Sequence, residues 1–416
     1  MPRRKNAILL TLILSGEVIF FLPFVLARIF RPSLLLVFEI TNLELGTFFS
    51  IYGLVAMGSY FFGGPLADRF PARNLISIAL VLTALGGIIL YLFPFSMMLA
   101  VMYAFWGVTS IFLFWAALIK ATREWGGSGF QGRSFGFLEG GRGLAAALIG
   151  TLALGIFSYS MEPDAVQSIT IKRIESFRLV ILATSLITLF TGVLAFLVIP
   201  ARLADNDSLE KLPGIGLFLQ LLKKPDIYLQ ALIIVSAYVG YKITDDISLY
   251  AQQVLNLNEV QAASTGSAAL WLRPLFAVIA GLLADRFSGT KVLIYCFLLM
   301  SFGSITIALG AFTGVLVMVL ITLASTLAGV YGMRGVYFAL MEDTRIPLQH
   351  TGAAVGIISL IGFTPDIFMG PTMGFLLDNY PGESGHQCIF AMMTAFALIG
   401  LISSLLLGRR IKVLSA

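Results

Sequence analysis

The sequence predicts an all-α membrane protein with twelve transmembrane helices in two pseudo-symmetric six-helix bundles. Three observations predict this fold class: an apolar composition, a series of long apolar segments, and a duplicated motif. Of the 416 residues, 58% are hydrophobic and only 12% are charged, about half the charged share of an ordinary soluble domain. Such a composition cannot cover a water-soluble surface, so it argues against a cytosolic enzyme, a nucleic-acid-binding protein and a disordered scaffold.

Apolar segments long enough to cross a bilayer follow one another along the chain, separated by short polar connections. We expect spans at residues 7–29, 46–67, 74–94, 97–119, 134–159, 178–199, 227–250, 262–284, 291–312, 315–338, 353–376 and 387–407. The first segment follows three basic residues, as a signal peptide would. It is too long for the apolar part of a signal peptide and contains Glu17, so we interpret it as the first transmembrane helix.

The distribution of basic residues predicts the topology. An even number of spans places both termini on one side of the membrane. If that side is the cytoplasm, eighteen of the 27 lysines and arginines belong to cytoplasmic segments and five to external ones. Basic residues are enriched on the cytoplasmic side, so we expect cytoplasmic termini in a plasma membrane such as the bacterial cytoplasmic membrane. The same rule explains the net charge of +5 without a nucleic-acid partner.

The longest cytoplasmic connection separates two halves of six spans each. We predict an N-terminal bundle at residues 1–200, a central cytoplasmic loop at 201–225 and a C-terminal bundle at 226–416. A seven-residue segment that starts at Gly64 and closes the second span returns at Gly281, at the end of the eighth span. The shift is 217 residues, and six of the seven positions are identical. Duplication of a six-span unit is typical of transporters, in which two similar bundles surround the substrate site.

The duplicated segment is similar to the signature of the major facilitator superfamily. That signature runs Gly, three residues, Asp, Arg or Lys, any residue, Gly, any residue and two basic residues. The matching positions in the two copies are Gly64, Asp68, Arg69, Arg73, Gly281, Asp285, Arg286 and Lys291. The resemblance implies that these residues latch one conformation of a transporter. From the residues alone, Gly64 would allow a close approach of helices, and simple loop capping is the alternative.

A looser similarity points to one subfamily. The residues Arg123-Glu-Trp125, followed by a glycine-rich stretch from Gly132, resemble the sugar-phosphate and organophosphate permeases. Those proteins carry an arginine in the middle of the first span and another in the seventh. Here Glu17 and Lys242 stand in those spans, and this departure argues against phosphate-ester exchange.

Ionisable residues within the spans are the candidates for substrate binding or coupling, because a charge in hydrocarbon is costly. Some have a partner one helical turn away: Glu139 with Arg142, and Lys242 with Asp245 or Asp246. Others need partners from another helix, water or substrate. These are Glu17, Arg273, Arg334 and Asp366. Structural ion pairs are the alternative interpretation for all of them.

Glu17 and Arg334 are the strongest of these candidates. Arg334 lies between Tyr331 and Tyr337 in the sequence, and a guanidinium in such surroundings suits a carboxylate or phosphate. Glu17 precedes several phenylalanines, and an apolar environment suits a carboxyl group that takes up and releases a proton.

A further group of charges predicts an outer gate. Arg28 lies near the outer end of the first span, and Asp245 and Asp246 lie in the outer part of the seventh. The repeat shift places these segments at equivalent positions of the two halves. We expect Arg28 to pair with one of the aspartates when the cavity opens inward. In the alternative, Lys242 neutralises both aspartates and Arg28 extends to the outer headgroups.

Together these features predict a secondary transporter that works by alternating access, with proton-coupled transport of a small organic anion or sugar-like acid. The alternatives are a sugar-phosphate/phosphate antiporter and a membrane receptor of the same fold that binds a solute without carrying it. The chain shows no nucleophile or metal-binding motif, so we expect no enzymatic activity, metal or cofactor. The expected partners are membrane lipids, the solute and protons, and we expect a monomer.

Overall fold

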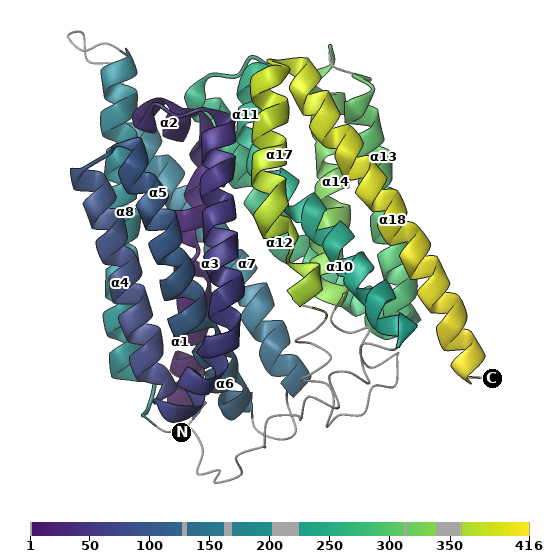
Figure 1. Cartoon of the computed structure of the whole chain (residues 1–416), viewed down its shortest axis with the longest axis horizontal. Coiled ribbons are helices and arrows are strands. Elements are labelled where there is room, and N and C mark those ends of the chain that lie inside the picture. The colour runs from purple at the N-terminus through teal and green to yellow at the C-terminus, as the bar shows by residue number, and fades with distance from the viewer. Residues whose placement is uncertain are drawn as a thin grey trace. The chain divides into compact units, whose positions relative to one another are not determined.

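The computed structural model describes residues 2–126, 131–161, 169–201, 224–311, 314–337, 358 and 360–415. Every regular element within these ranges is helical, which confirms the all-α membrane fold (Figure 1). Eleven segments of the described chain are long and apolar enough to cross a membrane. The helix α3 (Asn42–Arg69), 28 residues long, stands in the place of the predicted second span.

Contacts within the chain define two compact units, each described by itself. Unit 1 comprises Met1–Asp205, Asp245–Trp271 and Gly370–Phe375, and unit 2 comprises Asn206–Thr244, Leu272–Met369 and Leu376–Ala416. The predicted bundles 1–200 and 226–416 are sequence halves, and their limits stay a prediction. By their contacts, two segments of the second half, Asp245–Trp271 and Gly370–Phe375, belong to the same unit as the first half. Most of the predicted central loop 201–225 lies outside the described residues.

Unit 1 contains the helices of the first half together with one short helix and parts of two long helices from the second half. Its elements are α1 (Pro2–Val18), η1 (Phe21–Val25), α2 (Leu26–Phe38), α3, α4 (Ala72–Leu92), α5 (Ser96–Gly107), η2 (Val108–Trp115), α6 (Ala116–Gly126), α7 (Gln131–Ser160), α8 (Ile169–Val198) and α11 (Ile247–Gln253). The helices α12 (Glu259–Phe287) and α17 (Pro365–Asn379) contribute to both units.

The first span of unit 1 is interrupted between α1 and α2. Pro23 lies in the π-helical turn η1. Proline has no backbone N–H, and its ring displaces the carbonyl of the preceding turn, so the regular hydrogen-bond ladder cannot continue. The N–H of Val25 instead bonds the carbonyl of Phe20. The interruption separates Glu17, on α1, from Arg28, on α2.

The turn between α2 and α3 has its own sequence signals. Glu39 ends α2 in the left-handed region, with φ at 51°. Thr41 then begins α3 with a capping box: its hydroxyl accepts from the Glu44 N–H, and the Glu44 carboxylate accepts from the Thr41 N–H. These two bonds fix the direction in which α3 leaves the corner.

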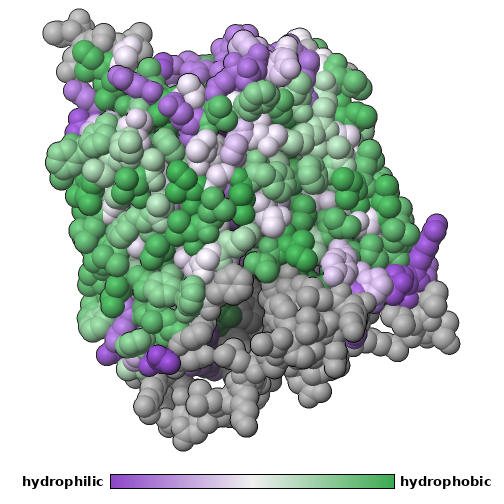
Figure 2. Space-filling view, viewed as in Figure 1, coloured by the Kyte–Doolittle hydropathy of each residue, from purple (hydrophilic) through white to green (hydrophobic). Residues whose placement is uncertain are grey.

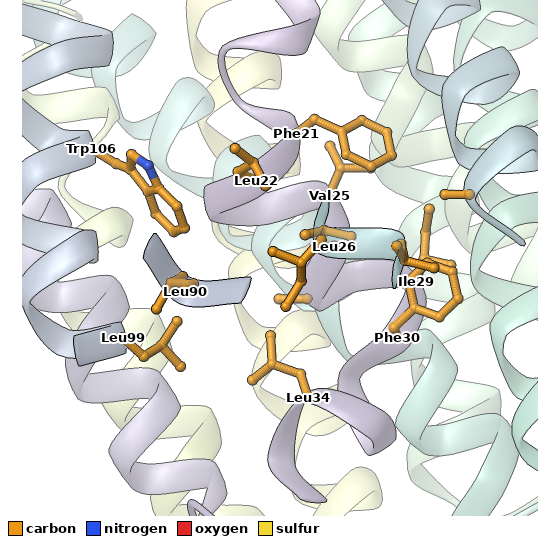
Figure 3. Packing of buried hydrophobic residues seen from close by; sticks show 14 of the residues in the cluster. Phe21, Leu22, Val25, Leu26, Ile29, Phe30, Leu34, Leu90, Leu99 and Trp106 are labelled. Carbon is orange, nitrogen blue, oxygen red and sulfur yellow. The ribbon is translucent and has the colours of Figure 1, made fainter. Parts of the chain in front are cut away.

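Buried aliphatic and aromatic side chains form the core of unit 1. Figure 3 shows part of it, where Leu22, Val25 and Leu26 from the interrupted first span face Leu90 and Trp106. The residues 370–375 of α17 join this unit because glycines allow the backbones to touch. A Cβ on Gly46 of α3 would overlap the carbonyl of Gly370, so a side chain on Gly46 would push these helices apart.

Unit 2 is built from α10 (Pro225–Ile243), α13 (Gly289–Ala308), α14 (Leu316–Val336), α18 (Glu383–Ser415) and its shares of α12 and α17. The helix α13 packs against both α14 and α18, and α10 packs against α18. A hydrogen bond of 2.8 Å between the hydroxyls of Ser304 and Thr394 joins α13 to α18. The short turn η3 (Thr244–Asp246) ends α10 and leads into α11 of unit 1.

The outer surfaces of the helices are apolar. Phe62, Phe190 and Tyr295 are each about two-thirds exposed. On the face drawn in Figure 2, hydrophobic residues cover the sides of the helices, while hydrophilic residues gather toward the helix ends. Apolar surface of this extent is stable in contact with lipid and not in water.

Candidate functional site

The first charged cluster lies in unit 1 and joins two predictions that the sequence left separate. Glu17, at the end of α1, and Arg142, on α7, are both buried. The Arg142 Nε lies 3.4 Å from the Glu17 Oε2, and the Arg142 Nη1 lies 2.6 Å from the Glu139 Oε1. These contacts set two carboxylates around one guanidinium. We name Glu17, Glu139 and Arg142 the acidic cluster.

Aromatic rings complete the surroundings of Arg142. Its guanidinium lies 5.6 Å from the ring of Phe20 and 5.7 Å from the ring of Trp115. These two rings meet edge to face at 6.1 Å. Both distances are within the range in which a ring face attracts a cation. The rings therefore hold the guanidinium in an apolar setting, where its ion pairs are stronger than in water.

The second cluster lies in unit 2 and brings together Lys242, Arg334 and Asp366. Lys242, on α10, is buried, and its Nζ lies 3.4 Å from the Asp366 Oδ1 in the first turn of α17. The hydroxyl of Tyr238 donates to both oxygens of Asp366, at 3.0 and 3.1 Å. The contact with Asp366 joins Lys242 to another helix, a partner that the spacing along α10 could not indicate.

Arg334, on α14, lies over the same side of α10. Its guanidinium is 3.9 Å from the centre of the Tyr241 ring and 6.0 Å from that of Tyr238. The two tyrosine rings stack on one another at 5.8 Å. We name Tyr238, Tyr241, Lys242, Arg334 and Asp366 the basic cluster, because its described contacts combine two cations with one carboxylate.

Sequence reasoning missed Tyr238 and Tyr241. It expected Arg334 to be framed by Tyr331 and Tyr337 of its own helix, but the rings in these contacts come from α10. A usable signal was present: Tyr238, Tyr241 and Lys242 are three and four residues apart, so they share one face of a helix. The remaining candidate, Arg273, is buried on α12 beside Pro274 and belongs to neither cluster as defined by these contacts.

A third set of contacts, within unit 1, joins the interrupted first span to the segment 245–271. The Arg28 Nε donates to the Asp245 Oδ1 at 2.7 Å, and the Nη2 lies 2.6 Å from the same oxygen. Both side chains are only 2% exposed, and Asp246 beside them is also buried. Arg28 and Asp245 are 217 residues apart, which is the shift of the duplicated segment. The same shift would place them at one position of the two repeats.

Two further contacts hold the same surfaces together. Arg173, near the start of α8, forms an ion pair with Glu259 at the start of α12, and Gln252 donates to the same carboxylate. Gly266 of α12 lies against the backbone at Arg28, where a Cβ would come within 3.0 Å of the carbonyl oxygen. The α2 helix thus contacts the second-half segment of unit 1 through one charged pair and close backbone packing, and α8 contacts it through a second charged pair.

The predicted latch positions lie at equivalent junctions of the two repeats. One copy runs from the end of α3 to the start of α4 and includes Gly64, Asp68, Arg69 and Arg73; the other runs from the end of α12 to the start of α13 and includes Gly281, Asp285, Arg286 and Lys291. The side chains of Asp68 and Asp285 lie outside the described residues. The Lys120 Nζ donates to the carbonyl of Ala67, so a cation from α6 caps the end of α3.

The expected role of Gly64 in close helix packing is not what the described chain shows. A Cβ on Gly64 or Gly281 would have no described neighbour within 4 Å. The close approach falls one residue earlier, where a Cβ on Gly63 would come within 3.0 Å of the carbonyl oxygen of Phe112. A helix turns by about 100° per residue, so neighbouring glycines face different partners.

The interrupted first span, the duplicated junctions and the buried charges agree with one known family. The family model of the Major Facilitator Superfamily matches residues 7–368. The chain belongs to the Major Facilitator Superfamily. It is therefore a multi-pass membrane protein of a transporter family and not an enzyme.

Relatives of this superfamily member include two inner membrane proteins of Escherichia coli (strain K12). YihN is 27% identical over 425 residues, covering 99% of this chain and 97% of that protein. YqcE is 24% identical over 420 residues, covering 96% and 93%.

Solved structures of the superfamily share the fold. A D-xylose-proton symporter superposes with a TM-score of 0.75 at 15% identity, covering 97% of both chains. A bacterial homolog of the human lysosomal transporter Spinster, inward-facing and unoccupied, gives 0.72 at 15% identity, covering 98% and 97%. At this identity the likeness shows the fold of the superfamily and not the solute.

Proposed function

We propose that the protein is a secondary transporter that moves a small organic anion, or a sugar-like acid, together with protons by alternating access. The observation that carries this proposal is the basic cluster. Its arginine is held against an aromatic ring, and its lysine lies beside a carboxylate that another side chain already binds. The proposal places this protein in a bacterial cytoplasmic membrane with both termini in the cytoplasm, acting as a monomer.

The geometry of the basic cluster favours a solute with both a carboxylate and hydroxyl groups. The planar guanidinium of Arg334 can donate two parallel hydrogen bonds to a carboxylate. The carboxylate of Asp366 accepts a hydrogen bond from the hydroxyl of Tyr238, and it can accept hydrogen bonds from solute hydroxyls in the same way. The ring of Tyr241 offers an apolar surface beside these groups. A hydroxy acid offers a carboxylate to the guanidinium and hydroxyl groups to Asp366, whereas a neutral sugar offers only hydroxyl groups.

The acidic cluster supports the proton part of the proposal. The described contacts bring two carboxylates to one guanidinium, and a proton bound to one carboxylate would leave the other paired with Arg142. Glu139 is 46% exposed and Glu17 only 3%. This difference gives a proton an accessible carboxylate next to a buried one.

The contact between Arg28 and Asp245 supports a closed outer gate. In the proposed topology both residues lie toward the outside of the membrane, and both are almost fully buried. Breaking the pair exposes two charges that are satisfied here, so the pair favours the conformation in which the outer ends are joined. We propose that it opens when the outside becomes accessible.

Uptake into proteoliposomes tests the function. With an acidic exterior, we expect labelled gluconate to accumulate, and a protonophore should abolish the accumulation while leaving exchange measurable. Glucose serves as the neutral comparison. Exchange of glucose 6-phosphate for internal phosphate, insensitive to the protonophore, would instead identify an antiporter. Binding of gluconate without any counterflow would identify a receptor.

A further inference from the structure

A surface cavity at one end of unit 2 is separate from both charged clusters. It has a volume of about 590 Å³ and lies between the start of α10 and the end of α18. Leu229, Leu406 and the ring of Tyr228 form its apolar wall, and Arg409 and Arg410 form its charged rim. From this cavity we infer that the protein binds the headgroup of an anionic phospholipid.

The charges around the cavity select an anion. Arg409 and Arg410 are exposed, Lys412 follows them closely in the sequence, and Lys224 directly precedes Pro225 of the cavity lining. Asp226, in the first turn of α10, accepts a hydrogen bond of 2.6 Å from the Arg410 Nε. This bond holds the guanidinium across the gap between the two helices. Within the described part of the chain no other contact engages the Arg410 guanidinium or Arg409, so their remaining N–H groups are available to a phosphate group.

The apolar wall and the position of the cavity select a lipid over a free anion. Leu406 and Tyr228 are both more than 40% exposed, so the cavity continues onto the surface that faces hydrocarbon. In Figure 2 the surface at the C-terminal end of α18 changes from hydrophobic to hydrophilic, as it does where a span reaches the headgroups. The predicted topology places this end on the cytoplasmic side, where anionic lipids attract basic residues.

The site has a direct connection to the proposed transport machinery. The helix α10, which starts at the cavity, also carries Tyr238, Tyr241 and Lys242 of the basic cluster. A phosphate that bridges α10 and α18 adds to the contacts between these two helices. We therefore expect the protein to retain the bound lipid, and we expect the lipid to raise the melting temperature of the protein.

Lipid retention provides the test. The full-length protein is placed in nanodiscs of phosphatidylcholine alone, or of an equimolar mixture with phosphatidylglycerol, and retained lipid is counted by native mass spectrometry after extraction. We expect wild type to retain phosphatidylglycerol and to melt at a higher temperature in the mixture. Arg409→Gln with Arg410→Gln should weaken retention roughly fivefold for each arginine removed. Arg3→Gln with Arg4→Gln, which removes the same charge from the same predicted side, should retain lipid as wild type does.

Two further arms decide between the sources of phosphate and guard against misfolding. Glycerol 3-phosphate added in detergent should not stabilise the protein; if it does so as well as the lipid, the site binds a free phosphate and the lipid inference is wrong. Asp226→Asn keeps an oxygen that can accept from the Arg410 Nε but removes a negative charge beside the cavity, so it should increase retention of phosphatidylglycerol. Equal retention by wild type, the double arginine variant and Asp226→Asn would overturn the inference.

Discussion

The acidic cluster of unit 1 and the basic cluster of unit 2 use similar parts with opposite balance. Each has buried charges on different helices and aromatic rings beside an arginine. In the acidic cluster one guanidinium lies between two carboxylates, whereas in the basic cluster an ammonium and a guanidinium accompany one carboxylate. Under the proposed function, the ratio of cations to carboxylates in these contacts, and not the presence of an ion pair, distinguishes the proton site from the anion site.

The two clusters also differ in how the arginine is held. Arg142 is fixed by two ion pairs, with rings 5.6 and 5.7 Å away. Arg334 lies 3.9 Å from the ring of Tyr241, a closer contact with an aromatic face. A stacked guanidinium keeps its in-plane N–H groups directed outward, toward a ligand. The N–H groups of Arg142 instead face the carboxylates of Glu17 and Glu139, an arrangement that suits a structural and proton-linked role.

The largest effect is expected from breaking the acidic cluster. Arg142→Gln leaves two carboxylates without their shared guanidinium, and loss of one partner of a buried pair costs about 3–5 kcal/mol. We expect little folded protein in the membrane, measured by fluorescence-detected size exclusion. The matched triple variant with Glu17→Gln, Glu139→Gln and Arg142→Gln should fold.

The triple variant also separates structure from coupling. If the cluster binds the proton, the folded variant should exchange gluconate but should not accumulate it under a pH gradient. Normal accumulation would show that the acidic cluster has only a structural role, and the contrast with the basic cluster would then lose its functional meaning.

A smaller effect is expected from changing the geometry of the basic cluster while keeping its charge. Arg334→Lys loses the forked donor pair and the planar stacking on Tyr241, so binding of a carboxylate should weaken by about 2 kcal/mol, roughly thirtyfold in KM. Initial rates of gluconate uptake measure this. Arg178→Lys is the control, since Arg178 belongs to unit 1 and its guanidinium also lies over a tyrosine ring, that of Tyr91. Unchanged KM in Arg334→Lys would rule out the anion site.

Variants of the Arg28–Asp245 pair test whether the preference for one conformation is set outside both clusters. Arg28→Asp should shift the protein toward the outward-open form by about 1–3 kcal/mol. The readout is faster labelling of Ser248→Cys, a buried position on α11, by a membrane-impermeant maleimide, with Cys296 and Cys388 replaced by alanine. Adding Asp245→Arg should restore the original rate, whereas adding Asp246→Arg should not. Wild-type labelling in the single variant would mean that no gate exists there.

The smallest effect is expected from one hydroxyl group. Tyr238→Phe removes the hydroxyl that donates one bifurcated hydrogen bond to the two Asp366 oxygens while keeping the stacked ring, and a net loss of about 1 kcal/mol should raise the KM for gluconate roughly fivefold. Tyr295→Phe is the matched control, because Tyr295 is exposed on the surface of α13. If both variants transport alike, Asp366 does not need Tyr238 to hold it.

The sequence predicts most of the fold and the ionisable members of each cluster, but not the two tyrosines of the basic cluster or how the members are joined. Long apolar segments and charge asymmetry are local properties, so the spans can be read directly. The pair Glu139 and Arg142 also follows from spacing on one helix. The contacts of Glu17 with Arg142, of Lys242 with Asp366, and of Arg334 with Tyr241 cross between helices. Periodicity shows which residues share a face, but it does not show which helix that face meets.

The pair of Arg28 and Asp245 carries information about ancestry. The repeat shift would place both residues at one position of a repeated unit, and their side chains touch. In a symmetric dimer of a single six-helix chain, a position that meets its own copy would set two arginines, or two aspartates, against each other. Opposite charges at that position require two separately inherited copies. A salt bridge between such positions therefore requires two halves that differ in sequence, so it became possible only once the two copies could change separately.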